Sequence, residues 1–210
     1  MTLKKNNKDV LTALFAALLV LSNILSAKLI PIGPVLIPGG IICFAAAFLI
    51  SDVINELYGK DSGKQAIYIG FIAQILCSCL IALTALLPGV DSETSAAFDL
   101  VMKVNFWSVV ASLISFLSAS FVDLKIFHAI KSKLQNPKYK WVWNNLSTII
   151  GQLVDTTIYV IIAFGIGHEL LWTQAAVITL SLMILGQFTV KTILAILDTP
   201  IFYWLTKQTN

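Results

Sequence analysis

The stretch Asn144 to Phe164, NNLSTIIGQLVDTTIYVIIAF, is long and apolar enough to cross a lipid bilayer as one helix. It nevertheless carries polar and small residues whose spacing places them in one stripe on a helix: Asn144, Thr148, Gly151, Gln152, Asp155 and Tyr159. A carboxylate at membrane depth costs about 3 kcal/mol on insertion scales, so Asp155 must face a bundle interior or a wet cavity. We therefore interpret the stripe as one wall of a binding site.

The composition is that of a polytopic membrane protein. Of the 210 residues, 58% are hydrophobic and 12% are charged, and the mean hydropathy is +0.87. All 14 basic residues are lysines, and the net charge of +3 is too small to indicate a nucleic-acid partner. The three cysteines lie in apolar runs without histidine nearby, so neither a disulfide, a metal site nor a cofactor is expected.

Five further apolar runs complete a predicted all-α fold, a single six-helix transmembrane domain over residues 1–210. The expected helices cover about residues 10–30, 40–58, 65–87, 105–122 (continuing to 134) and 175–197, with a short surface helix between 90 and 104. Asp198 to Pro200 is expected to kink or close the last helix. Most lysines fall at the two termini and in alternate connections, which predicts that both termini are cytoplasmic.

Two other helices contribute candidate site residues. Asp52, Asn55 and Glu56 share a face at the end of the second helix, where two carboxylates oppose the helix dipole. This face is either a solvated helix end or part of a site. On the sixth helix Gln187 and Lys191 are four residues apart. Asp155 and Lys191 are the deepest acid and base, so a direct or ligand-bridged pair is expected, and a purely structural ion pair is the alternative.

Amides beside a carboxylate suit a small, flat ligand with donor and acceptor edges, for example a guanine-like edge. The candidate substrate-binding residues are Asp155, Gln152, Thr148, Asn144, Asn145, Lys191, Gln187, Asp52, Glu56 and Asn23. Catalysis is not expected, because His128 and His168 fall on opposite sides of the membrane and no hydrolase or metalloprotease motif is present. The sequence therefore predicts a membrane protein that binds a small molecule and is not an enzyme.

Four segments resemble the queuosine precursor transporter family, in the vitamin-uptake-transporter group of six-helix bacterial inner-membrane proteins. They are SDVINELYGK (51–60), VDLKIFHAIK (122–131), STIIGQLVDTTIYVIIAF (147–164) and residues 191–200. The residues that fall on the family pattern are Asp52, Ser147, Thr148, Gly151, Asp155, Lys191 and Pro200. The resemblance implies uptake of 7-cyano-7-deazaguanine, 7-aminomethyl-7-deazaguanine or queuine for tRNA modification. It also implies a fold similar to the substrate-binding subunits of energy-coupling-factor transporters, working without the ATPase module.

The expected partners are this base and the lipid bilayer of the cytoplasmic membrane, without nucleic acid. The alternative is a non-transporting or ATPase-dependent substrate-binding subunit for another vitamin-like ligand. The sequence leaves open which base is carried, what energises transport and whether the chain forms a homo-oligomer.

Overall fold

The computed structural model describes residues 2–32, 35–102, 106–134, 136–166 and 174–207. Within these ranges, six helices are long and apolar enough to cross a membrane. The long helices are α1 (Thr2–Leu25), α2 (Ile41–Tyr58), α3 (Lys60–Ala85), α5 (Phe106–Leu134), α6 (Lys140–Val160) and α7 (Gln174–Leu197). The shorter elements are β1 (Leu29–Ile32), β2 (Val35–Pro38), α4 (Ser92–Met102), η1 (Pro137–Tyr139), η2 (Ile161–Ile166) and α8 (Thr199–Thr206). The predicted helical membrane fold is confirmed.

The first helix differs most from its prediction, because α1 ends at Leu25 and not near Ile30. The following residues form an antiparallel hairpin in which Leu29 pairs with Pro38 and Ile32 with Val35. Proline at three positions of this segment prevents a helix from continuing. Gly40, which caps the start of α2 after these strands, accepts a hydrogen bond from the hydroxyl of Ser22 on α1 over 2.9 Å. Paired strands thus replace the end of the helix that the sequence predicted to reach residue 30.

The other predicted boundaries agree with the structure to within a turn or two. The expected surface helix is α4, whose N-terminus is capped by Asp91 accepting from the backbone N–H of Thr94 over 2.7 Å. The expected break after Leu197 separates α7 from α8, with Pro200 in the first turn of α8. The α-helical part of α6 ends at Val160 and continues as the π-helical turn η2. His168, which the sequence predicts to lie on the side of the membrane opposite to His128, lies outside the described residues.

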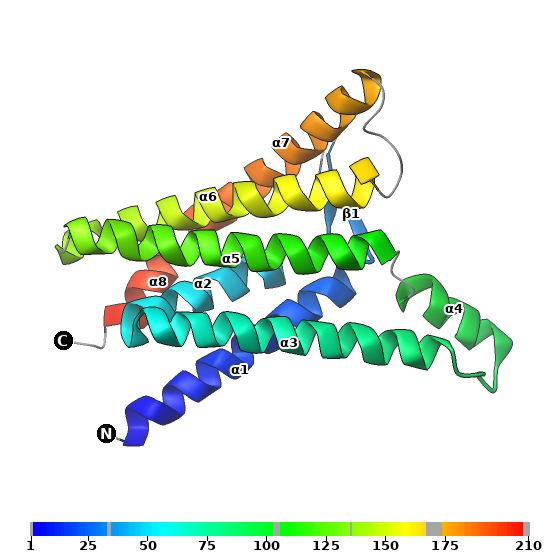
Figure 1. Cartoon of the computed structure of the whole chain (residues 1–210), viewed down its shortest axis with the longest axis horizontal. Coiled ribbons are helices and arrows are strands. Elements are labelled where there is room, and N and C mark those ends of the chain that lie inside the picture. Colours follow the sequence, from blue (N-terminus) through cyan, green and yellow to red (C-terminus); the bar gives the residue numbers. More distant parts are fainter. Residues whose placement is uncertain (1, 33–34, 103–105, 135, 167–173, 208–210) are drawn as a thin grey trace.

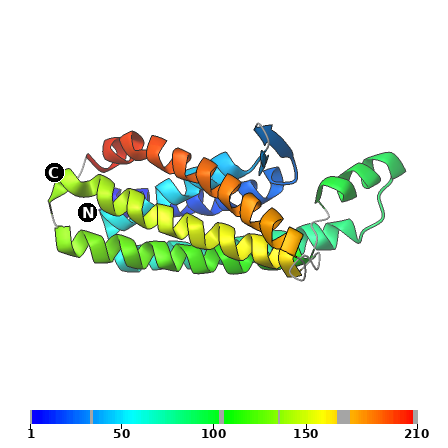
Figure 2. The same cartoon turned by 90° about the horizontal axis from the view of Figure 1, so that it is seen from above.

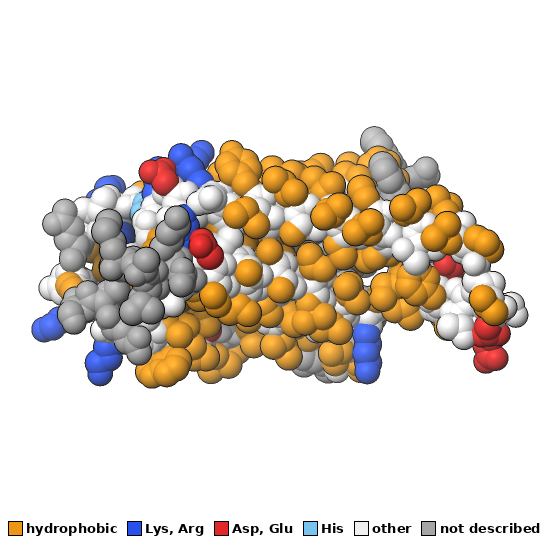
Figure 3. Space-filling view, turned by 90° about the horizontal axis from the view of Figure 1, so that it is seen from below, with side chains coloured by type: hydrophobic (Ala, Val, Ile, Leu, Met, Phe, Trp, Pro, Cys, Tyr) orange, Lys and Arg blue, Asp and Glu red, His pale blue; other side chains and the backbone are white. Residues whose placement is uncertain are grey.

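The long helices form one bundle in which α5 and α6 run side by side (Figures 1 and 2). Both ends of the chain and the α2–α3 and α5–α6 connections lie at the same end of the bundle, and α4 projects from the other (Figure 1). A broad band of hydrophobic side chains covers the middle of the surface, with most charged side chains at the two ends (Figure 3). This distribution fits a bilayer around the middle of the bundle.

The apolar core lies where α1, α2, α3 and α5 meet. Phe15 and Leu19 of α1 pack there against Ile67 of α3 and Phe116 of α5. Gly70 permits this contact, because a Cβ at that position would lie 2.7 Å from a methyl carbon of Leu19. A second cluster around Trp143, Phe127 and Phe202 joins α6, α5 and α8. Packing of α6 between these groups leaves its polar stripe facing α2, α5 and α7.

Candidate binding site and its polar interior

The stripe predicted on α6 is buried in the bundle. Asn144, Thr148, Gln152 and Asp155 are each at most 5% exposed. Tyr159, which ends the predicted stripe, is half-buried. The residues opposite the stripe come from α2, α5 and α7, and the polar contacts fall into three levels along α6. We call these the deep pair, the central cluster and the end network.

The deep pair is an ion pair between Lys191 of α7 and Asp155 of α6. The Lys191 ammonium donates to Oδ2 of Asp155 over 2.6 Å and to the hydroxyl of Thr156 over 3.2 Å. It also lies 4.7 Å from the ring centroid of Phe44 on α2, which is the geometry of a cation–π contact. Gln187 lies one turn before Lys191 and is also buried. The direct pair expected from the sequence is therefore present.

The central cluster joins α2, α5 and α6. Thr148 donates its hydroxyl to Oδ2 of Asp52 over 2.8 Å. Asp123 of α5 lies beside Asp52 and next to the hydroxyls of Ser147 and Thr148. Asp52 and Asp123 are each 1% exposed, so Asp52 does not belong to a solvated helix end. No lysine among the described residues forms an ion pair with either carboxyl.

The end network surrounds Glu56, near the α5–α6 connection. Its carboxylate lies 2.6 Å from the ammonium of Lys131 and 3.3 Å from that of Lys140. The indole N–H of Trp143 donates to the same carboxylate over 3.3 Å. These contacts come from α5 and α6 and supply the compensation that the unfavourable dipole position of Glu56 requires. The predicted site residue Glu56 therefore already has protein partners and lies apart from the deep pair.

Several buried polar atoms near the stripe have no hydrogen-bond partner in the described part of the chain. They are oxygens of Asp52, Asp123, Asn144 and Gln152; the amide of Asn55, also without a partner there, lies against Gly63 of α3. A buried polar atom without a partner costs about 1–3 kcal/mol, so such a concentration calls for a ligand or ordered water. An interior rich in acceptors suits a molecule that carries N–H donors.

Two of the predicted site residues lie elsewhere. Asn145 bonds to Thr199 through both its amide nitrogen and its oxygen, which ties α6 to α8. Asn23 accepts from Ser112 over 3.1 Å and joins α1 to α5, where Ser112 in turn accepts from Gln74. The structure therefore brings these two amides to helix interfaces and not to the stripe.

Sequence reasoning missed Asp123. It interpreted Asp123 as the start of the cytoplasmic extension of α5, whereas the carboxyl lies in the central cluster. The signals were an acid within one turn of an apolar run and its place in the family-like segment 122–131, but the contact with Asp52 depends on tertiary packing. Gly151 makes this packing close, because a Cβ there would lie 3.0 Å from the Cβ of Asp123 and 3.4 Å from the carbonyl oxygen of Ala119.

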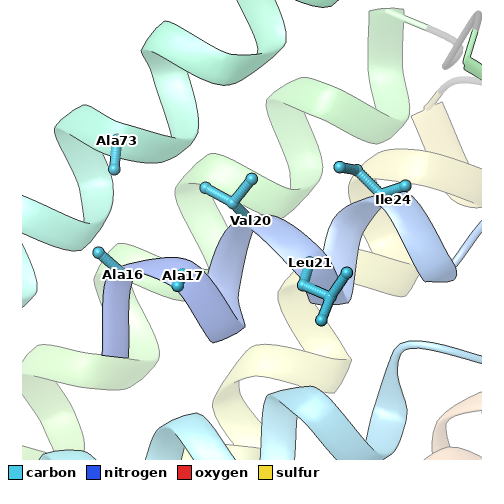
Figure 4. A pocket seen from close by; sticks show the side chains of 6 residues that line it. All are labelled: Ala16, Ala17, Val20, Leu21, Ile24 and Ala73. Carbon is cyan, nitrogen blue, oxygen red and sulfur yellow. The ribbon is translucent and has the colours of Figure 1, made fainter. Parts of the chain in front are cut away.

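Two grooves lie away from the stripe. The larger, of about 420 Å³, is an apolar groove between α1 and α3 that includes Val20, Ile24 and Ala73 (Figure 4). The smaller, of about 230 Å³, lies beside Lys8 and Gln65 near the ends of the same helices. The polar stripe, by contrast, is enclosed by side chains that are themselves buried.

Apolar helices that enclose buried ionisable and amide side chains, as here, are typical of polytopic membrane transport proteins. A family described as "Putative vitamin uptake transporter" matches residues 38–205. The chain belongs to this family and is a multi-pass protein of the cell membrane.

A similar curated protein is the "Probable queuosine precursor transporter" of Bacillus subtilis (strain 168), which is 29% identical over 148 residues. The alignment covers 67% of this chain and 62% of that relative, so the chain spans less than two thirds of its length. No solved structure matches the chain. The similarity to energy-coupling-factor subunits and the cytoplasmic orientation of the termini therefore stay predictions.

Proposed function

We propose that the chain, acting as a single six-helix domain, imports a 7-deazaguanine base for salvage into tRNA modification. The observation that carries the proposal is the set of unpartnered oxygens on the buried stripe of α6, beside the deep pair. The curated relative named as a queuosine precursor transporter supports the same class of substrate.

The chemistry of the base fits this lining. A 7-deazaguanine carries a ring N–H and an exocyclic NH₂ on one edge and a carbonyl beside them. The unpartnered oxygen of Gln152 can accept from one of the two donors. Lys191 occupies Oδ2 of Asp155, which leaves Oδ1 able to accept as well.

The test is uptake of radiolabelled 7-cyano-7-deazaguanine into liposomes that contain the purified chain alone. Unlabelled guanine should compete better than hypoxanthine, because hypoxanthine lacks the NH₂ donor. Competition by 7-aminomethyl-7-deazaguanine and by queuine then ranks the three natural candidates. A requirement for a second protein would favour an ATPase-dependent subunit instead.

Gln152→Leu removes the unpartnered acceptor while keeping similar bulk. It should weaken binding of the base about fivefold, since a hydrogen bond contributes about 1 kcal/mol and 1.4 kcal/mol is tenfold. The matched control is Gln65→Leu on α3, where the exposed amide bonds only to Lys8. Equal affinities of the two variants would exclude Gln152 from the site.

A further inference from the structure

The carboxyl groups of Asp52 and Asp123 face each other inside the bundle. Both residues are 1% exposed, and their carboxyl groups lie near enough for the charge of one to act on the other. Thr148 of α6 donates its hydroxyl to Oδ2 of Asp52 over 2.8 Å. The remaining Oδ1 atom of each carboxyl is buried without a partner. The pair is therefore an enclosed site with two oxygens still able to bind a ligand.

Two carboxyl groups that lie side by side without water require a proton. Ionised carboxylates are acceptors only and cannot bond to each other. Two like charges at this distance, away from water, cannot both stay ionised, so the pair shares a proton. Burial and proximity thus describe a carboxyl pair with one bound proton, in which Thr148 donates to Asp52.

The charged groups around the pair do not neutralise a second negative charge. Lys191 of α7 is bonded to Asp155, and Lys131 of α5 and Lys140 of α6 are bonded to Glu56. Asp198, at the junction of α7 and α8, is a further acid near Asp52 and supplies no positive charge. The remaining titratable side chains of the packed helices are exposed or half-buried near the helix ends: Lys8, Asp9, Lys60, Asp61, Lys64, Lys125, His128 and Lys133. A bound cation therefore balances the negative charge of the carboxyl pair.

The position of the pair connects it to the candidate binding site. Thr148 lies one helical turn from Gln152, and about 10 Å along α6 from Asp155, at 1.5 Å per residue. The pair also joins α2 to α5 and α6, so a change in its charge acts on the contact between these helices. Loss of the proton would place two carboxylates against each other and push the helices apart.

Resting on the proposed function, we infer that the Asp52–Asp123 pair carries one proton in each transport cycle and couples uptake of the base to the proton gradient. When the site faces outward, one carboxyl receives a proton from the external medium, and the two carboxyl groups then share it. When the site faces the cytoplasm, the same proton is released to water. A neutral base therefore enters together with one proton, and each cycle moves one positive charge inward.

Liposomes with an imposed pH gradient, acidic outside, test the coupling with labelled 7-cyano-7-deazaguanine. The wild type should accumulate the base, with proton entry reported by a trapped pH-sensitive dye. Asp123→Asn should accumulate at least tenfold less base than the wild type. It should still exchange external for internal base when no gradient is present. Asp61→Asn, which removes an exposed acid at the start of α3, should behave as the wild type.

Three results would overturn the inference. Asp123→Asn could accumulate the base on a pH gradient as well as the wild type does. A sodium gradient at equal pH could drive accumulation, which would make sodium the bound cation. The base could also equilibrate without responding to either gradient.

A second measurement needs no substrate and separates this inference from the proposed function. Infrared spectroscopy of the purified protein should show a protonated carboxyl band that disappears as the pH rises. The band should be lost in Asp123→Asn and in Asp52→Asn and kept in Asp61→Asn. Its absence from the wild type across the pH range where the protein is folded would refute the shared proton, even if the base is transported. Its presence without any exchange of the base would instead refute the proposed substrate.

Discussion

Lys191 and Asp155 form an ion pair of 2.6 Å between α7 and α6, inside the part of the bundle that spans the membrane. The side chains are 9% and 7% exposed, so little water screens the pair. Thr156 accepts from the same ammonium, and the ring of Phe44 lies below it. The lysine therefore has three partners, which explains how the bundle tolerates a cation at this depth.

The first prediction concerns the stability of this pair. Asp155→Asn keeps the size of the side chain but leaves Lys191 as an unpaired buried charge. Breaking a buried pair in this way costs about 3–5 kcal/mol. We expect a lower yield and a lower melting temperature in detergent. Asp155→Asn combined with Lys191→Met removes both charges and should partly restore the melting temperature without restoring binding of 7-cyano-7-deazaguanine.

Two outcomes distinguish the roles of Asp155. If the single variant is as stable as the wild type but no longer binds the base, Asp155 binds the base and contributes little to stability. If it binds with unchanged affinity but is made less well, Asp155 serves only the ion pair. In that second case the base must bind elsewhere on the stripe, at Asn144 and Gln152.

The deep pair and the stripe could be predicted because both depend on spacing and depth along single helices. Three- and four-residue spacing fixes the face of α6 regardless of what packs on it. Lys191 is the deepest base in the predicted membrane spans. An unpaired charge at this depth has a high free-energy cost, so its pairing with Asp155 could be predicted from that cost. The same reasoning placed the break near Asp198, because proline at position 200 limits the helix.

What could not be predicted depends on contacts between distant segments. Asp52, Asn55 and Glu56 share a face in sequence, but their side chains meet different neighbours. Glu56 is bonded to two lysines of other elements, while Asp52 meets Asp123 across the interface of α2 with α5. The paired strands β1 and β2 after α1 were also missed. Their pairing joins two segments of the chain, and the helical spacing of residues does not reveal it.

The second prediction fixes the orientation in the membrane. In a variant without Cys43, Cys77 and Cys79, a new cysteine is placed at Lys138 or at Ser92, in the exposed ends of the bundle. A membrane-impermeant maleimide added to intact cells should label Ser92→Cys and leave Lys138→Cys unlabelled. Labelling of Lys138→Cys from outside would reverse the predicted topology.

The third prediction concerns the close packing of α5 on α6. Gly151→Leu introduces a side chain where even a Cβ would lie 3.0 Å from Asp123 and 3.4 Å from the carbonyl of Ala119. Overpacking costs about 1–3 kcal/mol, and here it also separates Asp123 from the hydroxyls of α6. We expect a lower melting temperature and weaker accumulation of the base. The control is Ala129→Leu, at an exposed position of α5, which should change neither quantity.

The fourth prediction concerns Glu56, which joins α2 to α5 and α6 at the lysine-rich end of the bundle. Its carboxylate accepts from Lys131, Lys140 and Trp143, and hydrogen bonds to a charged group contribute about 1.5–3 kcal/mol. Glu56→Gln keeps the shape but loses both ion pairs, so we expect a destabilisation of about 2 kcal/mol, seen as a lower melting temperature in detergent.

Salt dependence tests whether the loss at Glu56 is electrostatic. Lys131 is 31% exposed, so the solvent reaches this pair and added salt screens it. The difference in melting temperature between the wild type and Glu56→Gln should therefore shrink as the salt concentration rises. Glu93→Gln, at an exposed position of α4, is the control and should stay within about 0.5 kcal/mol of the wild type. A difference that is the same at low and high salt would mean that Glu56 stabilises the bundle by packing against Trp143, and the ion pairs would then contribute little.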